Sequence, residues 1–182
     1  MRKTRSATSQ DSKQIRAQPD FQALFFEHFG RRPRPHTYKV RFGTSNVYHD
    51  VIFLDSLVHD ARLSRHSVRR QGGRVTIRLQ RETWEVGTLV RKGAPPLHHV
   101  PSLLRISGVE RLVWRFANRK VRGELSLRGA HLQPPRDAEA YHFILDGYRW
   151  KLHLLLNEYR AGIVLHDTGT PRRYPVRTRS NG

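Results

Sequence analysis

Three pairs of basic side chains stand at spacings that put both members of each pair on one side of a β-strand. The pairs are Arg74 and Arg78, Arg111 and Arg115, and Arg149 and Lys151. Successive residues of a strand point to opposite sides of a sheet, so residues two or four apart share a side. The guanidinium group of arginine binds phosphate through parallel N–H groups. If the three strands are neighbours, the six residues form one positive surface for an anionic ligand.

Two His-Asp pairs, His49-Asp50 and His59-Asp60, raise the question of a metal-dependent hydrolase. Such an enzyme holds its metal with several His and Asp side chains from packed elements. Both pairs lie in alternating apolar sequence that is typical of strands, and no further ligands stand at helical spacing. We therefore predict no metal site and expect the Asp side chains to accept backbone N–H groups at strand ends. His98-His99 follows two prolines and is predicted to lie in a loop.

Motifs that carry catalysis are not found in the sequence. It contains no Gly-rich phosphate loop, no G-x-S-x-G, no H-E-x-x-H and no recognisable triad. Cysteine is absent, which excludes disulfides, thiolate zinc sites and thiol nucleophiles. We predict a protein that is not an enzyme and uses no cofactor.

The strongest strand pattern runs from Tyr141 to His166. Large apolar residues recur at every second position on both sides of Asp146-Gly147, and Asp-Gly between two such runs predicts a hairpin turn. A third strand over Ile163–Leu165 would complete a β-meander. The apolar side of residues 148–156 requires a second layer to cover it.

Further strands are predicted every 8–12 residues, separated by Gly and Pro, over residues 38–42, 47–54, 57–63, 74–80, 84–90, 103–106 and 111–116 and around 125–127. The spacing of apolar residues between Asp20 and Gly30 predicts a short amphipathic helix. The predicted fold is all-β, an antiparallel β-sandwich or partly open barrel with one short N-terminal helix. The aromatic residues Trp114, Phe116, Phe143 and Trp150 are expected to face the core.

Charge is distributed over the whole chain of 182 residues, which carries 34 basic and 15 acidic side chains. We divide the chain into a basic, partly disordered segment (1–36), a β domain (37–166) and a basic tail (167–182). The middle part holds 22 basic and 11 acidic residues, so most of the excess belongs to the β domain. Such a surface favours nucleic acid or an acidic protein as partner. The alternative is that the arginines reflect composition and are simply solvated.

No apolar run is long enough to span a membrane, and the N-terminus is polar rather than a signal peptide. We expect no membrane partner and a cytoplasmic location. The oligomeric state is left open.

Short motifs over residues 48–166 are similar to a known group of domains. They are Val58–Leu63 with its His-Asp, Arg74–Leu79 after a Gly turn, Ile106–Leu112, and the hairpin Asp146–Leu152. In these the chain resembles the small all-β domains of bacterial immunity-protein type that occur in polymorphic toxin systems. The resemblance implies a binding protein without catalysis.

Two functions follow as expectations. The first is a non-enzymatic protein that contacts an anionic partner, nucleic acid above all, through its arginine-rich surface. The second is an immunity-like or structural protein-binding module whose charge is incidental.

Overall fold

The structure is a computed structural model, and it describes residues 35–83, 98–117, 123–134 and 140–173. These residues form ten strands and one helix, α2 (Val47–Val58). The strands are β1 (Thr37–Val40), β2 (Arg62–Gln71), β3 (Arg74–Glu82), β4 (His98–Ser107), β5 (Val109–Phe116), β6 (Glu124–Gln133), β7 (Ala140–Gly147), β8 (Trp150–Asn157), β9 (Gly162–Asp167) and β10 (Arg172–Arg173).

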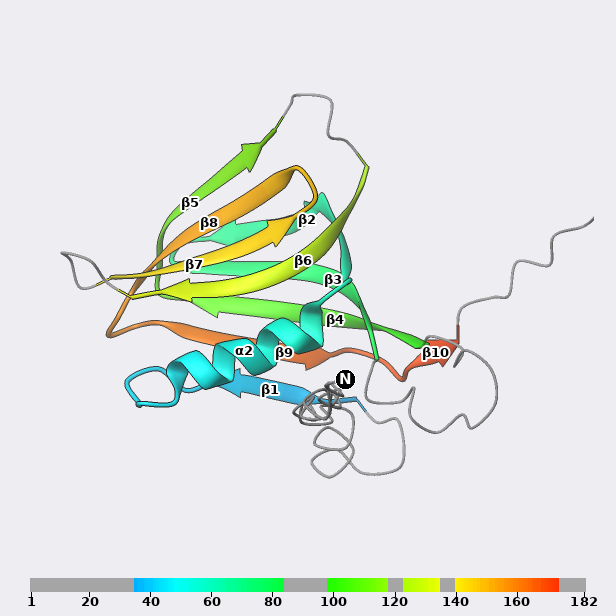
Figure 1. The fold of residues 1–182 in the computed structure, drawn as a ribbon, viewed down its shortest axis with the longest axis horizontal. Coiled ribbons are helices and arrows are strands. Elements are labelled where there is room, and N and C mark those ends of the chain that lie inside the picture. Colours follow the sequence, from blue (N-terminus) through cyan, green and yellow to red (C-terminus); the bar gives the residue numbers. More distant parts are fainter. Residues whose placement is uncertain (1–34, 84–97, 118–122, 135–139, 174–182) are drawn as a thin grey trace, which may run out of the picture.

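Nine strands form one continuous antiparallel sheet in the order β1-β9-β4-β3-β2-β6-β7-β8-β5, and β10 pairs with β4. The sheet curls so that β6, β7 and β8 lie in front of β2 and β3, and β4, β9 and β1 continue the sheet on the side of α2 (Figure 1). We call β1-β9-β4-β3-β2 the β3 half and β6-β7-β8-β5 the β8 half. The halves meet where β2 pairs with β6 through Arg62–Ser64. The all-β prediction, a sandwich or open barrel, is confirmed.

One apolar core lies between the two halves. The inward side of β3 supplies Val75, Ile77 and Leu79, and the inward side of β8 supplies Leu152 and Leu154, all of them buried. Their alternation with exposed residues follows the two-residue period of a strand. Of the aromatic residues predicted to face inward, Phe143 and Trp150 are buried, and Trp114 and Phe116 are partly buried against the core.

The prediction of two strands over residues 47–54 and 57–63 is wrong for most of this stretch, which forms α2. Val47, Val51, Leu54 and Val58 recur every three or four residues and are all buried. They face β6, β1 and β3, and Figure 1 shows α2 running between β1 and β6. The segment is rich in β-branched and aromatic residues, which favours a strand locally, but burial of one helical side outweighs that preference.

The Tyr141–His166 stretch differs from the predicted meander in two ways. The hairpin turn is Tyr148-Arg149, because Gly147 pairs with Trp150 inside the ladder. A Cβ at position 147 would overlap the Trp150 indole ring, so this glycine makes room for Trp150 and does not form the turn. In addition, β9 does not pair with β8. It crosses to the other half and lies between β4 and β1.

Three other predictions concern the periphery of the fold. His98-His99 belongs to β4 and pairs with β10, so the predicted loop is wrong at these residues. The predicted helix over 20–30 and the strand over 84–90 lie outside the described residues. Asp167, the first residue assigned to the C-terminal tail, is the last residue of β9.

Candidate anion-binding surfaces

Four arginines surround Thr76 on the outer side of the β3 half. Arg74 and Arg78 stand two residues before and after it on β3, while Arg69 on β2 and Arg105 on β4 are its cross-strand partners. In an antiparallel sheet these positions are about 6.7 Å away along a strand and about 5 Å away across it. We name Arg69, Arg74, Arg78 and Arg105 the arginine quartet. Lys39 on β1 lies in the same register row as Arg105, with Val164 between them.

No member of the quartet is paired with a carboxylate within the described part of the chain. All four side chains are exposed, and none makes an ion pair or a side-chain hydrogen bond with another described residue. The described outward positions 74–80 of β3, 101–107 of β4, 162–166 of β9 and 37–39 of β1 contain no Asp or Glu. Like charges side by side on a sheet destabilise the fold. An anion bound among them would relieve that repulsion.

A hollow of about 510 Å³ begins at Arg78 and continues past the irregular middle of β2. Its lining includes Ser64 and Ser67, and on its far side Arg62 lies 3.5 Å from Glu124. The surface at Arg78 is therefore concave as well as positively charged.

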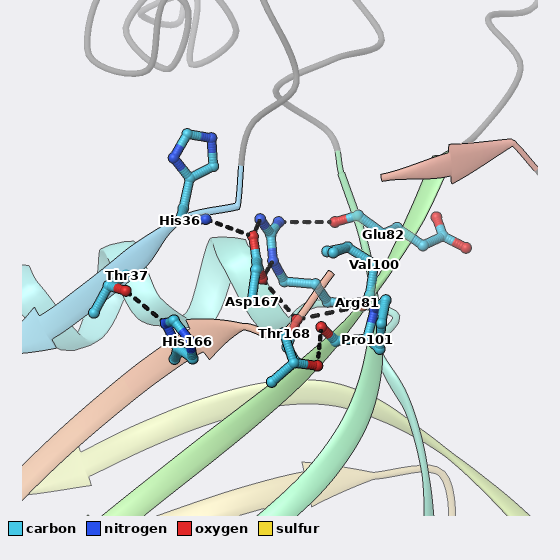
Figure 2. Close-up of polar contacts among 10 residues, drawn as sticks. His36, Thr37, Arg81, Glu82, Val100, Pro101, His166, Asp167 and Thr168 are labelled. Atoms are coloured by element: carbon cyan, nitrogen blue, oxygen red, sulfur yellow. Dashed lines mark hydrogen bonds and ion pairs between the residues drawn. The ribbon is translucent and has the colours of Figure 1, made fainter. Parts of the chain in front are cut away.

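A buried ion pair fixes the strands that carry the quartet (Figure 2). Arg81 Nε and Nη2 donate to the two carboxylate oxygens of Asp167, at 2.8 and 2.7 Å. Ser102 Oγ donates to the same carboxylate at 2.7 Å, and the backbone N–H of His36 does so at 3.0 Å. The group therefore joins β3, β9, β4 and the residue just before β1. Its contacts are satisfied internally, so we assign it a structural role.

The protonation state of Asp167 follows from this geometry. Burial by itself raises the pKa of a carboxyl group. The hydrogen bonds and charge of Arg81, together with the Ser102 hydroxyl and the His36 N–H, outweigh burial and hold the pKa of Asp167 below its usual range. Asp167 is therefore ionised at neutral pH.

The remaining predicted basic residues lie on the β8 half. Arg115 is the cross-strand neighbour of Lys151, and Lys151 Nζ lies 3.5 Å from Asp146. Arg149 occupies the hairpin turn at φ +65°, with its guanidinium carbon 5.0 Å from the centre of the Tyr148 ring. Arg111 pairs with Leu155, further along β5.

The six predicted residues therefore do not form one surface. Three strands (β2, β6 and β7) lie between β3 and β8, so Arg74 and Arg78 belong to the first half and the other four to the second. The sequence pattern missed Arg69, Arg105 and Lys39, because cross-strand neighbours depend on register. The available signal was the alternation of Arg105 with buried Leu104 and Ile106.

The His-Asp pairs have local roles. Asp50 is buried in α2 and accepts hydrogen bonds from the Arg41 side chain at 2.8 and 2.9 Å. His59 and Asp60 follow α2 and lie 3.1 Å from each other. In the part of the chain that the structure describes, no three His, Asp or Glu side chains are grouped as a metal site requires.

Comparison with protein-family models, with curated proteins and with solved structures found nothing that matches this chain. The resemblance to immunity-protein domains therefore stays a prediction. No helix among the described residues is long and apolar enough to cross a membrane.

Proposed function

We propose that this chain is a non-enzymatic protein that binds nucleic acid through the arginine quartet. The observation that carries the proposal is four exposed arginines arranged around Thr76, none of them paired with a carboxylate among the described residues. Each guanidinium group can bind two oxygens of a phosphate through parallel N–H groups. Several guanidinium groups on neighbouring strands can therefore contact successive phosphates.

The surface is suited to the phosphate backbone more than to the bases. Apart from the basic residues, the described outward positions of β3, β4, β9 and β1 hold Leu103, Val164, Pro101, His166 and small polar residues, and none of them is Phe, Tyr or Trp. Proteins that read single-stranded bases without sequence preference stack them on aromatic rings. We therefore expect binding that depends on salt and little on sequence. A cytoplasmic location is part of this proposal.

The test is binding of labelled single- and double-stranded DNA and RNA across a salt series. Arg69→Gln with Arg105→Gln removes two cross-strand members of the quartet. We expect affinity to fall by roughly tenfold or more, and the slope of log affinity against log salt to become shallower by about 1.4–1.8. The matched control is Arg111→Gln with Arg128→Gln, which removes the same charge from exposed positions in the β8 half.

Two results would contradict the proposal. One is a quartet variant that binds with unchanged affinity and slope. The other is wild-type binding that disappears near physiological salt, since that describes generic attraction alone. In either case the immunity-like protein-binding module becomes the function to test.

A further inference from the structure

Two histidines lie in contact on the outer side of the β8 half, far along the sheet from the quartet. His142 on β7 and His153 on β8 have ring centres 5.1 Å apart, and His142 Nε2 lies 2.9 Å from His153 Nδ1. On the other side, His142 Nδ1 lies 3.2 Å from Gln133 Oε1 on β6. The three side chains form one hydrogen-bonded row across three strands.

The ring N–H groups of the two histidines leave one nitrogen of the row without a partner in the described part of the chain. A neutral histidine carries one ring N–H. When His142 Nδ1 donates to Gln133 Oε1, His142 Nε2 must accept the proton of His153 Nδ1. His153 Nε2 is then left with a lone pair. This atom is buried and has no hydrogen-bond partner among the described residues. A proton added to the row at Nε2 would create an N–H donor that lacks an acceptor.

The row borders a hollow of about 600 Å³, which we call the histidine pocket. Three cations line it: Arg115 on β5, Lys151 on β8 and Arg149 in the turn between β7 and β8. Its apolar lining includes Phe116 and Ile144. The volume exceeds that of a phosphate group and falls in the range of small-molecule sites.

Charges around the pair favour an anion. The titratable and charged groups on the surrounding elements are Arg111 and Arg115 on β5, His131 on β6, Asp146 on β7, Lys151 on β8 and Arg149 in the turn. Asp146 lies 3.5 Å from Lys151, and this is the one carboxylate in the set. Burial, followed by the charges of His142, Arg115 and Lys151, lowers the pKa of His153. An anion in the pocket would offset those cations.

We propose that the histidine pocket binds a phosphate monoester, with Arg115 and Arg149 as donors to the phosphate, the apolar lining against the organic group, and the His142–His153 pair beside them, whose protonation responds to the bound charge. The site is separate from the arginine quartet and does not depend on the proposed nucleic-acid binding. The phosphate could be that of a small molecule or the terminal phosphate of a nucleic-acid strand, because both present the same group.

The experiment follows the imidazole signals of His142 and His153 by NMR while the full chain is titrated with phenyl phosphate, and with phenol as the uncharged control. We expect saturable shifts with phenyl phosphate only, and a pKa of His153 that rises when the ester is bound. Arg115→Gln should weaken binding about tenfold or more, the usual effect of losing a charged hydrogen bond. Arg111→Gln, on the same side of the same strand but outside the pocket, should change it less than about twofold.

A pair of oligonucleotides with and without a 5′-phosphate separates the two sources. Tighter binding of the phosphorylated strand that is lost in Arg115→Gln identifies the strand terminus, and equal binding identifies a small phosphate ester. The proposal is overturned if phenyl phosphate leaves both histidine signals unchanged, or if Arg111→Gln weakens binding as much as Arg115→Gln. The Arg69→Gln, Arg105→Gln variant should retain phenyl phosphate binding, so failure of one site is distinguishable from failure of the other.

Discussion

Asp167 is the centre of a buried hydrogen-bond network in the β3 half. It accepts hydrogen bonds from Arg81, Ser102 and the His36 N–H, and both members of its ion pair are 1% exposed. A buried ion pair stabilises little relative to apolar residues of the same size. Removing one partner is costly, however, because it leaves the other charge buried and uncompensated.

We expect Asp167→Asn to lower the free energy of unfolding by about 3–5 kcal/mol, because Arg81 would remain charged and buried without a counter-charge. Urea denaturation followed by circular dichroism measures this change. Glu124→Gln, which breaks the exposed pair with Arg62, is the control and should cost less than about 1 kcal/mol. Equal losses of unfolding free energy in the two variants would show that breaking the buried Arg81–Asp167 pair costs no more than breaking an exposed pair.

The sequence contained a signal for this pair. Arg81 continues the inward series Val75, Ile77 and Leu79, and a charged residue at an inward position implies a buried partner. The identity of the partner could not be inferred, since Asp167 is 86 residues away along the chain.

At the scale of elements, α2 closes the side of the core between β1 and β6. Leu54 is fully buried on one side of the helix, whereas Ile52, two residues earlier, is 58% exposed. This helix therefore offers a large apolar residue in each environment.

Leu54→Ala should destabilise the protein by about 2–5 kcal/mol, since it removes buried methyl groups and leaves a cavity. Ile52→Ala on the same helix should change stability by less than about 0.5 kcal/mol. Thermal or urea unfolding of the two variants provides the comparison. A large loss in Ile52→Ala would mean that this side of α2 is covered by a contact outside the described residues.

Elements with a strict two-residue period were predictable, and elements defined by distant partners were not. β3, β5 and β8 follow from alternation alone. The helix over 47–58 was missed because its β-branched residues imitate a strand, and only the surface against which it packs decides between the two. β9 was recognised as a strand, but its position between β4 and β1 depends on long-range pairing. For the same reason only two members of the quartet could be predicted from the sequence. Arg74 and Arg78 lie on one strand, whereas Arg69 and Arg105 lie beside them only because of the register between strands.

At the scale of the whole molecule, the net charge of +19 opposes folding. The quartet concentrates part of that charge within two strand spacings of Thr76. A surface under selection for stability alone would place carboxylates among these arginines, so their absence from the described outward positions is consistent with a binding role.

Replacing Arg69 and Arg105 by Gln should therefore stabilise the protein at low salt, by up to about 1 kcal/mol, while weakening anion binding. The gain should shrink as salt rises, because added ions screen the repulsion in the wild-type protein. Thermal unfolding at low and moderate salt tests this, with Arg111→Gln and Arg128→Gln as the charge-matched control. A variant that is less stable than wild type at low salt would contradict the repulsion argument.

The position of β9 has a consequence for how the chain is made. Among the described strands β1 pairs only with β9, with Thr37 opposite His166, so β1 cannot join the sheet until β9 has left the ribosome. At typical rates of synthesis, roughly 120 residues take about 6–25 s. For the later half of that interval, once β4 has been made, the edge of β4 that faces away from β3 is unpaired and is a template for joining other chains. Translation of this protein thus includes a period in which self-association competes with folding, and its positive charge, by mutual repulsion between nascent chains, is suited to delay that association.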